Sequence, residues 1–174
     1  MLRCPDVQIS GFATSMTNGA LTYQINDGHG ATSSAASVNV QRISGSSLTG
    51  SSGSDIIIGD QSNSCTISGG DGHDWLLGGT NADSISGGEG NDYLSGGPGA
   101  DVLMGGSGKD AINTGAPGTG RQDRVSAGPG KDSIVAVGTR AKARINCGAG
   151  FDTVRIVPAE RRYLRGCERV LVVR

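Results

Sequence analysis

The chain has 174 residues, of which 31 are glycine, while aromatic residues make up 3% and hydrophobic residues 35%. This composition excludes a domain with a thick, aromatic-rich core, so something besides apolar burial must support any fold. The net charge of −1 hides a division, because residues 1–120 carry a net −8 and residues 121–174 a net +7.

Residues 21–41, LTYQINDGHGATSSAASVNVQ, predict a β-hairpin near the N-terminus. Apolar residues alternate with polar ones up to Ile25, residues 27–30 supply a turn, and the alternation resumes through Val38 and Val40. This stretch resembles the last hairpin of bacterial cadherin-like or Ig-like surface domains. A full sandwich of that kind needs about 100 residues. We therefore expect residues 1–43 to be the C-terminal hairpin of a truncated domain, and the chain to be a monomeric fragment of a larger protein.

A nine-residue repeat organises the middle of the chain. From residue 69 it reads GGDGHDWLL, GGTNADSIS, GGEGNDYLS, GGPGADVLM and GGSGKDAIN, with Gly at positions one and two, Asp at six, and Leu or Ile at eight. Fainter copies carry Asp55 before this array and Asp123, Asp132 and Asp152 after it, where an insertion shifts the frame. Cys65 and Ala143 occupy the aspartate position of two degenerate copies.

Each repeat predicts one sharp turn followed by one short strand. Six glycine-rich residues can adopt positive φ and reverse the chain. The three residues that follow form a short strand whose central aliphatic side chain points inward. Two repeats make one coil of 18 residues, and the coils stack as parallel strands about 4.8 Å apart. The repeat therefore predicts an all-β solenoid, and its paired glycines exclude a long helix.

The repeated aspartates predict a metal site. Stacking aligns Asp74, Asp92 and Asp110 on one side of the solenoid, and Asp83 and Asp101 on the other. Carboxylates at this spacing repel one another unless a cation lies between them. Carboxylates combined with backbone carbonyls form the all-oxygen shell that calcium takes, whereas magnesium demands a smaller and more rigid one.

These blocks resemble the G-G-x-G-x-D-x-U-x nonapeptide of RTX (repeats-in-toxin) proteins. The resemblance implies a right-handed parallel β-roll that binds several Ca²⁺ ions, in a secreted or cell-surface bacterial protein. It implies side-chain ligands at Asp74, Asp83, Asp92, Asp101 and Asp110, with Asp55, Asp123, Asp132 and Asp152 as further candidates. Backbone carbonyl ligands are implied at Gly70, Gly72, Gly79, Gly88, Gly90, Gly97, Gly99, Gly106 and Gly108. Cys65 and Ala143 cannot serve as ligands of this kind.

The tail, RINCGAGFDTV followed by GCERVLVVR, resembles the end of actinobacterial calcium-binding repeat proteins. Cys147 and Cys167 both lie inside that pattern, so either a disulfide closes the last coil or two reduced thiols are buried there. We expect residues 44–155 to form the β-roll and residues 156–174 to form a capping strand that covers its open end. The basic residues of the tail are expected to be a solvated surface, with attraction to polyanions as the alternative.

The sequence predicts a non-enzymatic protein with a structural or adhesive role. It contains no H-E-x-x-H, G-x-S-x-G or P-loop motif, no zinc-type cysteine cluster and no apolar run of 18 residues. The expected partners are calcium and cell-surface or extracellular polymers, with no nucleic acid and no membrane span. The alternative is the calcium-dependent C-terminal domain of a secreted hydrolase, a protease or a lipase, whose catalytic part lies elsewhere.

Overall fold

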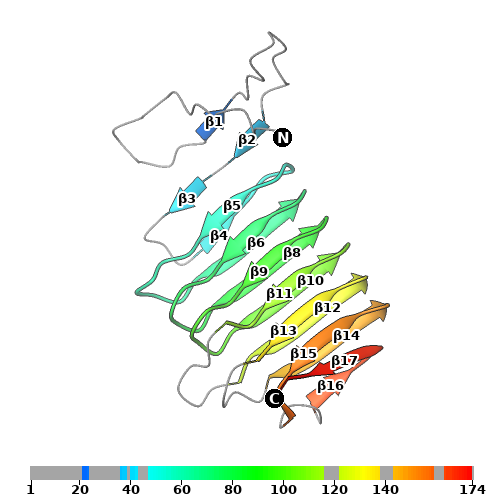
Figure 1. The fold of residues 1–174 in the computed structure, drawn as a ribbon. Helices are drawn as coiled ribbons and strands as arrows, with labels where there is room; N and C mark the ends of the chain where they lie inside the picture. The colour runs from blue at the N-terminus through cyan, green and yellow to red at the C-terminus, as the bar shows by residue number, and fades with distance from the viewer. Residues whose placement is uncertain are drawn as a thin grey trace, which may run out of the picture.

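The chain folds into a β-solenoid of about six turns in a computed structural model that describes residues 21–23, 36–38, 40–42, 47–115, 122–137, 143–158 and 163–173. Two parallel sheets of seven and eight strands lie face to face, and the chain passes from one sheet to the other at every turn (Figure 1). Among the described residues there is no α-helix. The predicted all-β parallel solenoid is confirmed.

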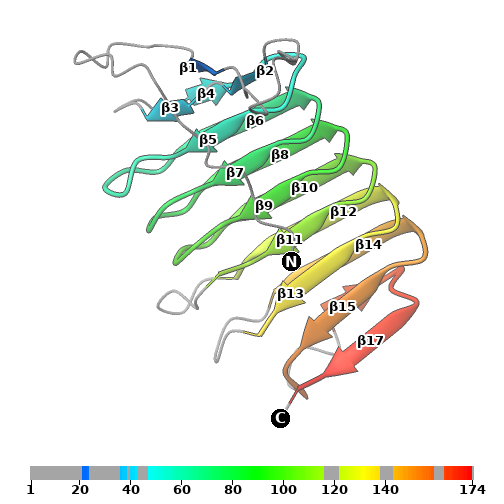
Figure 2. The same ribbon diagram turned by 45° about the horizontal axis from the view of Figure 1, so that its top comes forward.

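The seven-stranded sheet contains every second strand of the roll. In spatial order it consists of β16 (Leu164–Arg165), β14 (Arg144–Gly150), β12 (Arg124–Gly130), β10 (Val102–Ser107), β8 (Ser84–Glu89), β6 (Thr66–Asp71) and β4 (Ser47–Thr49). The eight-stranded sheet consists of β17 (Arg169–Val172), β15 (Thr153–Ile156), β13 (Ser133–Ala136), β11 (Ala111–Asn113), β9 (Tyr93–Ser95), β7 (Trp75–Leu77), β5 (Ile56–Ile58) and β3 (Val40–Arg42). Figure 2 shows the strands of both sheets stacked along one axis.

The core contains two facing rows of aliphatic side chains, one residue from each strand between β4 and β15. Every fixed eighth-position residue of the repeat lies in it, and its exposed fraction is 0–1%. The row of the seven-stranded sheet is Leu48, Ile67, Ile85, Leu103, Val125 and Ile145, and the row of the eight-stranded sheet is Ile57, Leu76, Leu94, Ile112, Ile134 and Val154. The same buried cluster also contains Cys65, Ala127, Ala136, Ala143, Cys147 and Ile156. A core this thin matches the low hydrophobic content of the chain.

The two ends of the roll differ in construction. At the N-terminal end, β3 pairs in parallel with β5, so parallel pairing begins at Val40. Before it, β1 (Leu21–Tyr23) and β2 (Ala36–Val38) pair antiparallel, as the hairpin prediction requires, with Leu21 opposite Val38. At the C-terminal end, β17 forms the predicted capping strand on the eight-stranded sheet, and the two-residue β16 covers the other sheet. A disulfide joins Cys147 to Cys167.

Candidate metal centre

The turns of the roll form two edges with different regularity. We call the turns that lead from the seven-stranded to the eight-stranded sheet the regular edge; they are residues 50–55, 69–74, 87–92, 105–110, 127–132 and 147–152. At each of them the buried aliphatic residues before and after the turn are nine positions apart. We call the opposite turns the variable edge, where the same spacing is 10, 9, 9, 13 and 11 positions.

From Asp74 onward, each aspartate of the regular edge accepts a hydrogen bond from the backbone of the preceding turn. The Asp74 backbone N–H donates to Asp92 Oδ1 at 2.9 Å, and the Asp92 N–H donates to Asp110 Oδ1 at 3.0 Å. The same bond is repeated from Asp55 to Asp74, from Asp110 to Asp132 and from Asp132 to Asp152. The variable edge has a shorter series of these bonds, from Cys65 to Asp83, from Asp83 to Asp101 and from Asp101 to Asp123. One carboxylate oxygen of each acceptor aspartate is therefore used by the fold itself.

The second carboxylate oxygen is left without a partner. Among the residues that the structure describes, seven Oδ2 atoms are buried and make no hydrogen bond: those of Asp74, Asp83, Asp92, Asp101, Asp110, Asp132 and Asp152. All seven side chains are at most 2% exposed. Because a buried, unpaired carboxylate oxygen is costly, a row of them indicates that another group completes the site.

Asp55 differs from the other aspartates of the regular edge. Its Oδ2 accepts hydrogen bonds from the backbone N–H of Ser51 at 2.6 Å and from the Ser51 hydroxyl at 3.0 Å. Ser51 stands where the repeat has its second glycine. The first turn of the regular edge therefore satisfies its own carboxylate.

Two glycines of the turn at 87–92 show why the repeat needs glycine there. A Cβ on Gly87 would collide with Asp92 Oδ2 and with the carbonyl oxygen of Gly105, which approach that point from two consecutive turns. Gly88 has a φ of 115°, and a Cβ there would collide with the Gly70 carbonyl oxygen. Ala127 and Cys147 hold the first position in the last two turns of the regular edge, so this requirement applies to the earlier turns, where the glycines leave space for the carboxylate and the carbonyls.

The carbonyl oxygens of most predicted glycine ligands lie against the corresponding glycine of the next coil. On the regular edge the carbonyl oxygen of Gly70 faces Gly88, and that of Gly88 faces Gly106. The fourth-position glycines form a second row, in which Gly72 faces Gly90 and Gly90 faces Gly108. On the variable edge Gly79 faces Gly97, whereas Gly99 lies against the carbonyl oxygen of Asn81. Carbonyl oxygens therefore lie between consecutive turns, on the same edges as the unpartnered carboxylate oxygens.

Burial makes these carboxylates hard to ionise. Desolvation, with a smaller contribution from neighbouring aspartates in the row, raises the pKa of Asp74 and of Asp110 to about 6, although a backbone hydrogen bond opposes the shift. Desolvation raises the pKa of Asp101 to about 7, although a backbone hydrogen bond opposes the shift. The pKa values of Asp83, Asp92, Asp123 and Asp132 are also raised, again mainly by burial. A bound cation would remove this penalty, because it stabilises the charged form.

The donor atoms fit a hard cation that accepts carbonyl ligands. Among the described residues no three His, Cys, Asp or Glu side chains converge on one point, so a transition-metal cluster is not indicated there. The available atoms are single carboxylate oxygens and rows of backbone carbonyls, all of them oxygen. Calcium takes six to eight such ligands in flexible geometry. The residues present therefore fit calcium.

The variable edge interrupts its row of carboxylates. Cys65 takes the aspartate position in the turn at 59–65, where its thiol accepts the Asp60 backbone N–H at 3.1 Å. Ala143 takes that position in a later turn and is 1% exposed. Both residues lie in register with the aspartates. The backbone stacking therefore continues at these two positions, and only the carboxylate is missing.

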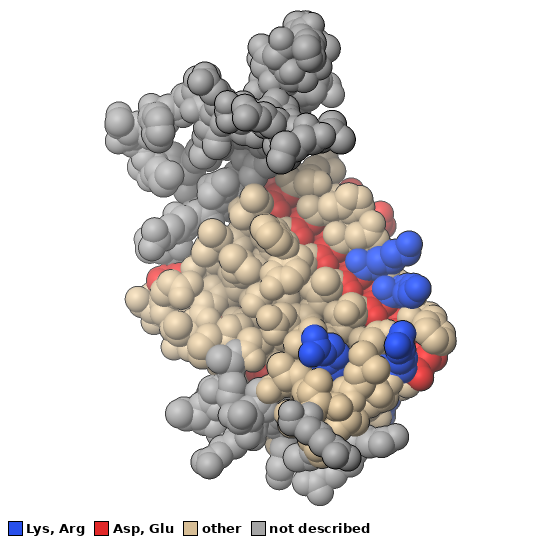
Figure 3. Space-filling model, in the orientation of Figure 1, with Lys and Arg blue, Asp and Glu red and all other residues tan. Residues whose placement is uncertain are grey.

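The acidic residues form a visible line on the surface. Figure 3 shows them following one another down the roll, turn after turn, with Lys and Arg residues beside the line toward the C-terminal turns. Two of the lysines of the chain, Lys109 and Lys131, directly precede the aspartates of regular-edge turns. The regular edge thus combines buried carboxylates with a few cationic side chains next to them in sequence.

A parallel roll whose turns present buried carboxylates and stacked carbonyls defines a calcium-binding structural fold. The family model of the RTX calcium-binding nonapeptide repeat, in four copies, matches residues 46–63, 68–103 and 86–116. The chain therefore carries RTX calcium-binding nonapeptide repeats, which bind several Ca²⁺ ions per array. No curated protein and no solved structure shows significant similarity to the chain. Within the described residues, no helix is long and apolar enough to cross a membrane.

One acidic residue of the ladder is not identified by the repeat. The Asp152 backbone N–H donates to Glu168 Oε2 at 2.9 Å, in the same way that the earlier aspartates donate to the next carboxylate. Glu168 lies outside the nonapeptide spacing and follows Cys167 directly. The feature of the sequence that points to Glu168 is the Cys-Glu pair of the tail.

Proposed function

We propose that the chain binds Ca²⁺ between consecutive turns of the roll and that calcium binding drives its folding. The observation that carries this proposal is the set of seven buried carboxylate oxygens without a hydrogen-bond partner. The proposed side-chain ligands are Asp74, Asp83, Asp92, Asp101, Asp110, Asp132 and Asp152, with Asp123 at the end of its row. The proposed carbonyl ligands are Gly70, Gly72, Gly79, Gly88, Gly90, Gly97, Gly99, Gly106 and Gly108. Asp55 is left out, because Ser51 already satisfies its carboxylate.

The two carboxylate oxygens of each proposed ligand have different roles. Oδ1 accepts a hydrogen bond from the backbone N–H of the preceding turn, so the carboxylate has a fixed orientation in the folded roll. Oδ2 faces the space that the glycines leave open. When bound, calcium would supply positive charge that compensates the negative charge of these carboxylates. Without it, buried like charges repel along the row, and the thin core offers little to offset that repulsion.

The coupling of metal binding to folding suggests a secreted or cell-surface protein with a structural or adhesive role. RTX repeat proteins are typically extracellular, and a disulfide is typical of oxidising compartments. In a cytoplasm poor in calcium the roll would stay open, and it would close outside the cell. We further propose that residues 44–155 act as the calcium-binding unit, residues 156–174 as its cap, and residues 1–43 as part of a neighbouring domain whose last strand, β3, adds to the eight-stranded sheet of the roll.

The second candidate function is the calcium-dependent C-terminal domain of a secreted hydrolase. A roll of this kind would then stabilise a catalytic domain carried elsewhere in the same protein. The two functions differ in what accompanies the roll in the native protein. A catalytic motif elsewhere in the native protein would favour the hydrolase. Tandem Ig-like repeats beside the roll would favour adhesion.

Circular dichroism with and without calcium tests the main proposal. In chelator we expect a largely unfolded chain, and in millimolar calcium a spectrum rich in β-structure. Extracellular calcium modules bind at about 10⁻⁴–10⁻³ M, so the midpoint should fall near that range. Magnesium at the same concentration is the control and should restore little structure. Identical spectra in chelator and in calcium would rule out calcium-driven folding.

A further inference from the structure

The carboxylate ladder of the regular edge continues past the last repeat. The Asp132 N–H donates to Asp152 Oδ1 at 2.8 Å, and the Asp152 N–H in turn donates to Glu168 Oε2 at 2.9 Å. Glu168 therefore has the same relation to Asp152 that every aspartate of the ladder has to the one before it. The C-terminal cap carries the next carboxylate of the row.

The turn that carries Glu168 is shorter than the turns of the repeat. Nine positions separate Ile145 from Val154, but only six separate Leu164 from Val170, which pairs with Val154 in the sheet. Glutamate has one methylene more than aspartate, and from this shorter turn its carboxylate accepts the same N–H. Gly166 has a φ of 61° and lies over Gly148, so the short turn still stacks on the turn before it.

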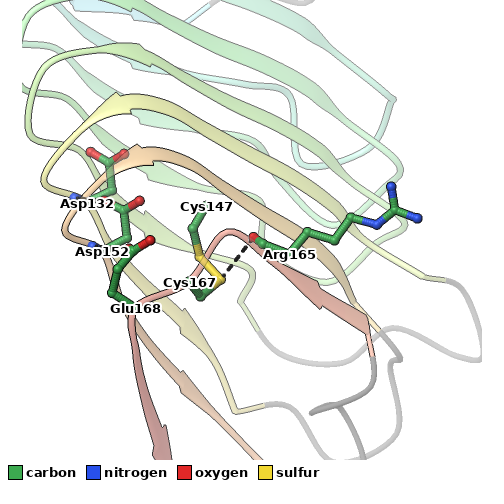
Figure 4. The surroundings of a disulfide bond; sticks show 6 residues. All are labelled: Asp132, Cys147, Asp152, Arg165, Cys167 and Glu168. Atoms are coloured by element: carbon green, nitrogen blue, oxygen red, sulfur yellow. Dashed lines mark hydrogen bonds between the residues drawn. A yellow bond between two sulfur atoms is a disulfide. The ribbon is translucent and has the colours of Figure 1, made fainter.

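The disulfide fastens this short turn to the turn that holds Asp152. Cys167 is the residue before Glu168, and Cys147 is the first residue of the turn at 147–152. Figure 4 shows the bond beside the three carboxylates of Asp132, Asp152 and Glu168, which follow one another along the edge. In the preceding turn Ala127 holds the position of Cys147. A cysteine is therefore not required there for packing, and the covalent link is the feature that it adds.

The space between Asp152 and Glu168 has an unpartnered buried oxygen. Asp152 is fully buried, and its Oδ2 makes no hydrogen bond. Arg165 is near in sequence, but Figure 4 shows its guanidinium group pointing away from the three carboxylates. Glu168 itself is exposed, so water can reach this end of the row.

We propose that Asp152 and Glu168 form a further calcium site at the C-terminal end of the regular edge, and that the Cys147–Cys167 disulfide positions Glu168 for it. This inference rests on the proposed calcium binding by the repeats. The site is the outermost of the row and is open to solvent on one side. It is therefore expected to be the weakest site and to fill last.

Calcium counting on a matched pair of variants tests the site. Glu168→Gln keeps an acceptor for the Asp152 N–H but removes the charge. Glu89→Gln removes an exposed acid of another regular-edge turn that lies outside the ladder. By equilibrium dialysis and isothermal titration calorimetry, we expect Glu168→Gln to bind one Ca²⁺ fewer than wild type and Glu89→Gln to match wild type. Equal stoichiometry and affinity in Glu168→Gln and wild type would overturn the proposal.

Two further variants separate charge, reach and covalent positioning. Glu168→Asp keeps the charge but loses a methylene, so it should lose the same ion as Glu168→Gln. A second variant replaces both cysteines by alanine, the residue that already stands at the equivalent position 127. It should bind the last ion about tenfold more weakly and the other ions with unchanged affinity. Wild-type affinity for the last ion in the alanine variant would refute the positioning role of the disulfide.

A measurement on the wild-type chain keeps the test independent of variant folding. The chain has three glutamates, at positions 89, 160 and 168, so carboxyl-labelled glutamate gives three ¹³C resonances, assigned with Glu89→Gln and Glu160→Gln. The Glu168 signal should shift with the last equivalent of calcium. A Glu168 signal that never moves while calcium folds the chain would refute this site alone. A wild-type chain that binds no calcium would refute the proposed function instead.

Discussion

The two edges of the roll start from the same nonapeptide but tolerate change differently. The regular edge keeps nine positions between buried residues in all six of its turns, with an aspartate at each. The variable edge accepts up to four extra residues and replaces its aspartate with Cys65 and with Ala143. Both edges stack the same strands, so stacking alone does not demand a fixed turn length. The difference indicates that the regular edge carries the stricter requirement.

The sheets explain part of this difference. On the regular edge the strands of the seven-stranded sheet run on into the turn, so β6, β8, β10, β12 and β14 are six or seven residues long. Glycines of the turns pair directly, such as Gly70 with Gly88. The strands of the eight-stranded sheet have three or four residues and end before the variable turns. An extra residue on the regular edge would therefore break the backbone pairing between neighbouring strands. On the variable edge it only lengthens a loop.

Inserting residues should give the largest difference between the edges. A Gly-Ser insertion after Gly90 lies in a regular turn and displaces Asp92 from its bond to the Asp74 N–H. The same insertion after Thr80 lies in a variable turn. We expect the first to raise the calcium midpoint of folding by more than about tenfold and the second by less than about threefold. Calcium titrations followed by circular dichroism measure both, and equal midpoints would contradict the proposed asymmetry.

Neutralising one aspartate on each edge should give the next largest difference. Asp92→Asn keeps the acceptor for the Asp74 N–H but removes a charge that lies between two intact neighbours. Asp83→Asn does the same where one neighbouring position is Cys65. The calcium midpoint should rise by about tenfold for Asp92→Asn, or about 1.4 kcal/mol, and by less for Asp83→Asn.

Asp55→Asn is the matched control within the regular edge. Because the Asp55 carboxylate is satisfied by Ser51, this substitution should leave the number of bound Ca²⁺ ions unchanged. Isothermal titration calorimetry gives that number for all three variants. A loss of calcium in Asp55→Asn equal to that in Asp92→Asn would mean that the unpartnered oxygens do not define the sites.

The sequence predicts the repeat and its alignment well because both depend on local spacing. Glycine pairs, aspartates and aliphatic residues at a constant period determine which side chains stack, and the core rows follow from the same period. The chemistry at single positions is harder to read. Ser51 replaces a glycine and closes the first turn, and no spacing rule says that it will bond Asp55. The extension of strands into one set of turns also depends on stacking of whole coils.

Glu168 shows a different limit of sequence reasoning. The repeat ends at Asp152, and the six-position turn of the cap has no counterpart in the nonapeptide. Only the pairing of β14 with β16 and of β15 with β17 sets the register that brings Glu168 to the Asp152 N–H. A side chain that joins a ladder from outside the period is identified through tertiary contacts.

Acidification should moderately stabilise the folded state of the calcium-free chain. Burial raises the pKa of Asp74 and Asp110 to about 6 and that of Asp101 to about 7, whereas unfolded aspartates titrate near 3.9. Between these values the folded state binds more protons, so the stability of the calcium-free roll falls as the pH rises through that window. In chelator we therefore expect more β-structure at pH 5 than at pH 8.

Proton release gives an independent reading of the same groups. Calcium binding near pH 6 should displace protons from the buried carboxylates, which a weakly buffered titration with a pH indicator detects. Asp101→Asn removes the variable-edge carboxyl with the highest of these pKa values and should reduce the release most near pH 7. Calcium binding without proton release at pH 6 would contradict the raised pKa values.

Restoring a carboxylate on the variable edge should have the smallest effect. The Cys65 backbone N–H donates to Asp83 Oδ1 at 2.7 Å, so position 65 is in register with the ladder, and Asp83 Oδ2 has no partner. Cys65→Asp supplies the missing charge, and its carboxylate can also accept the Asp60 N–H that the thiol now accepts. The turn is one position longer than the repeat, so the gain should be modest: a calcium midpoint lower by roughly threefold. Cys65→Asn is the uncharged control and should show no gain. If both variants titrate like wild type, a carboxylate in register is not sufficient to make a site, and turn length as well as charge would separate the two edges.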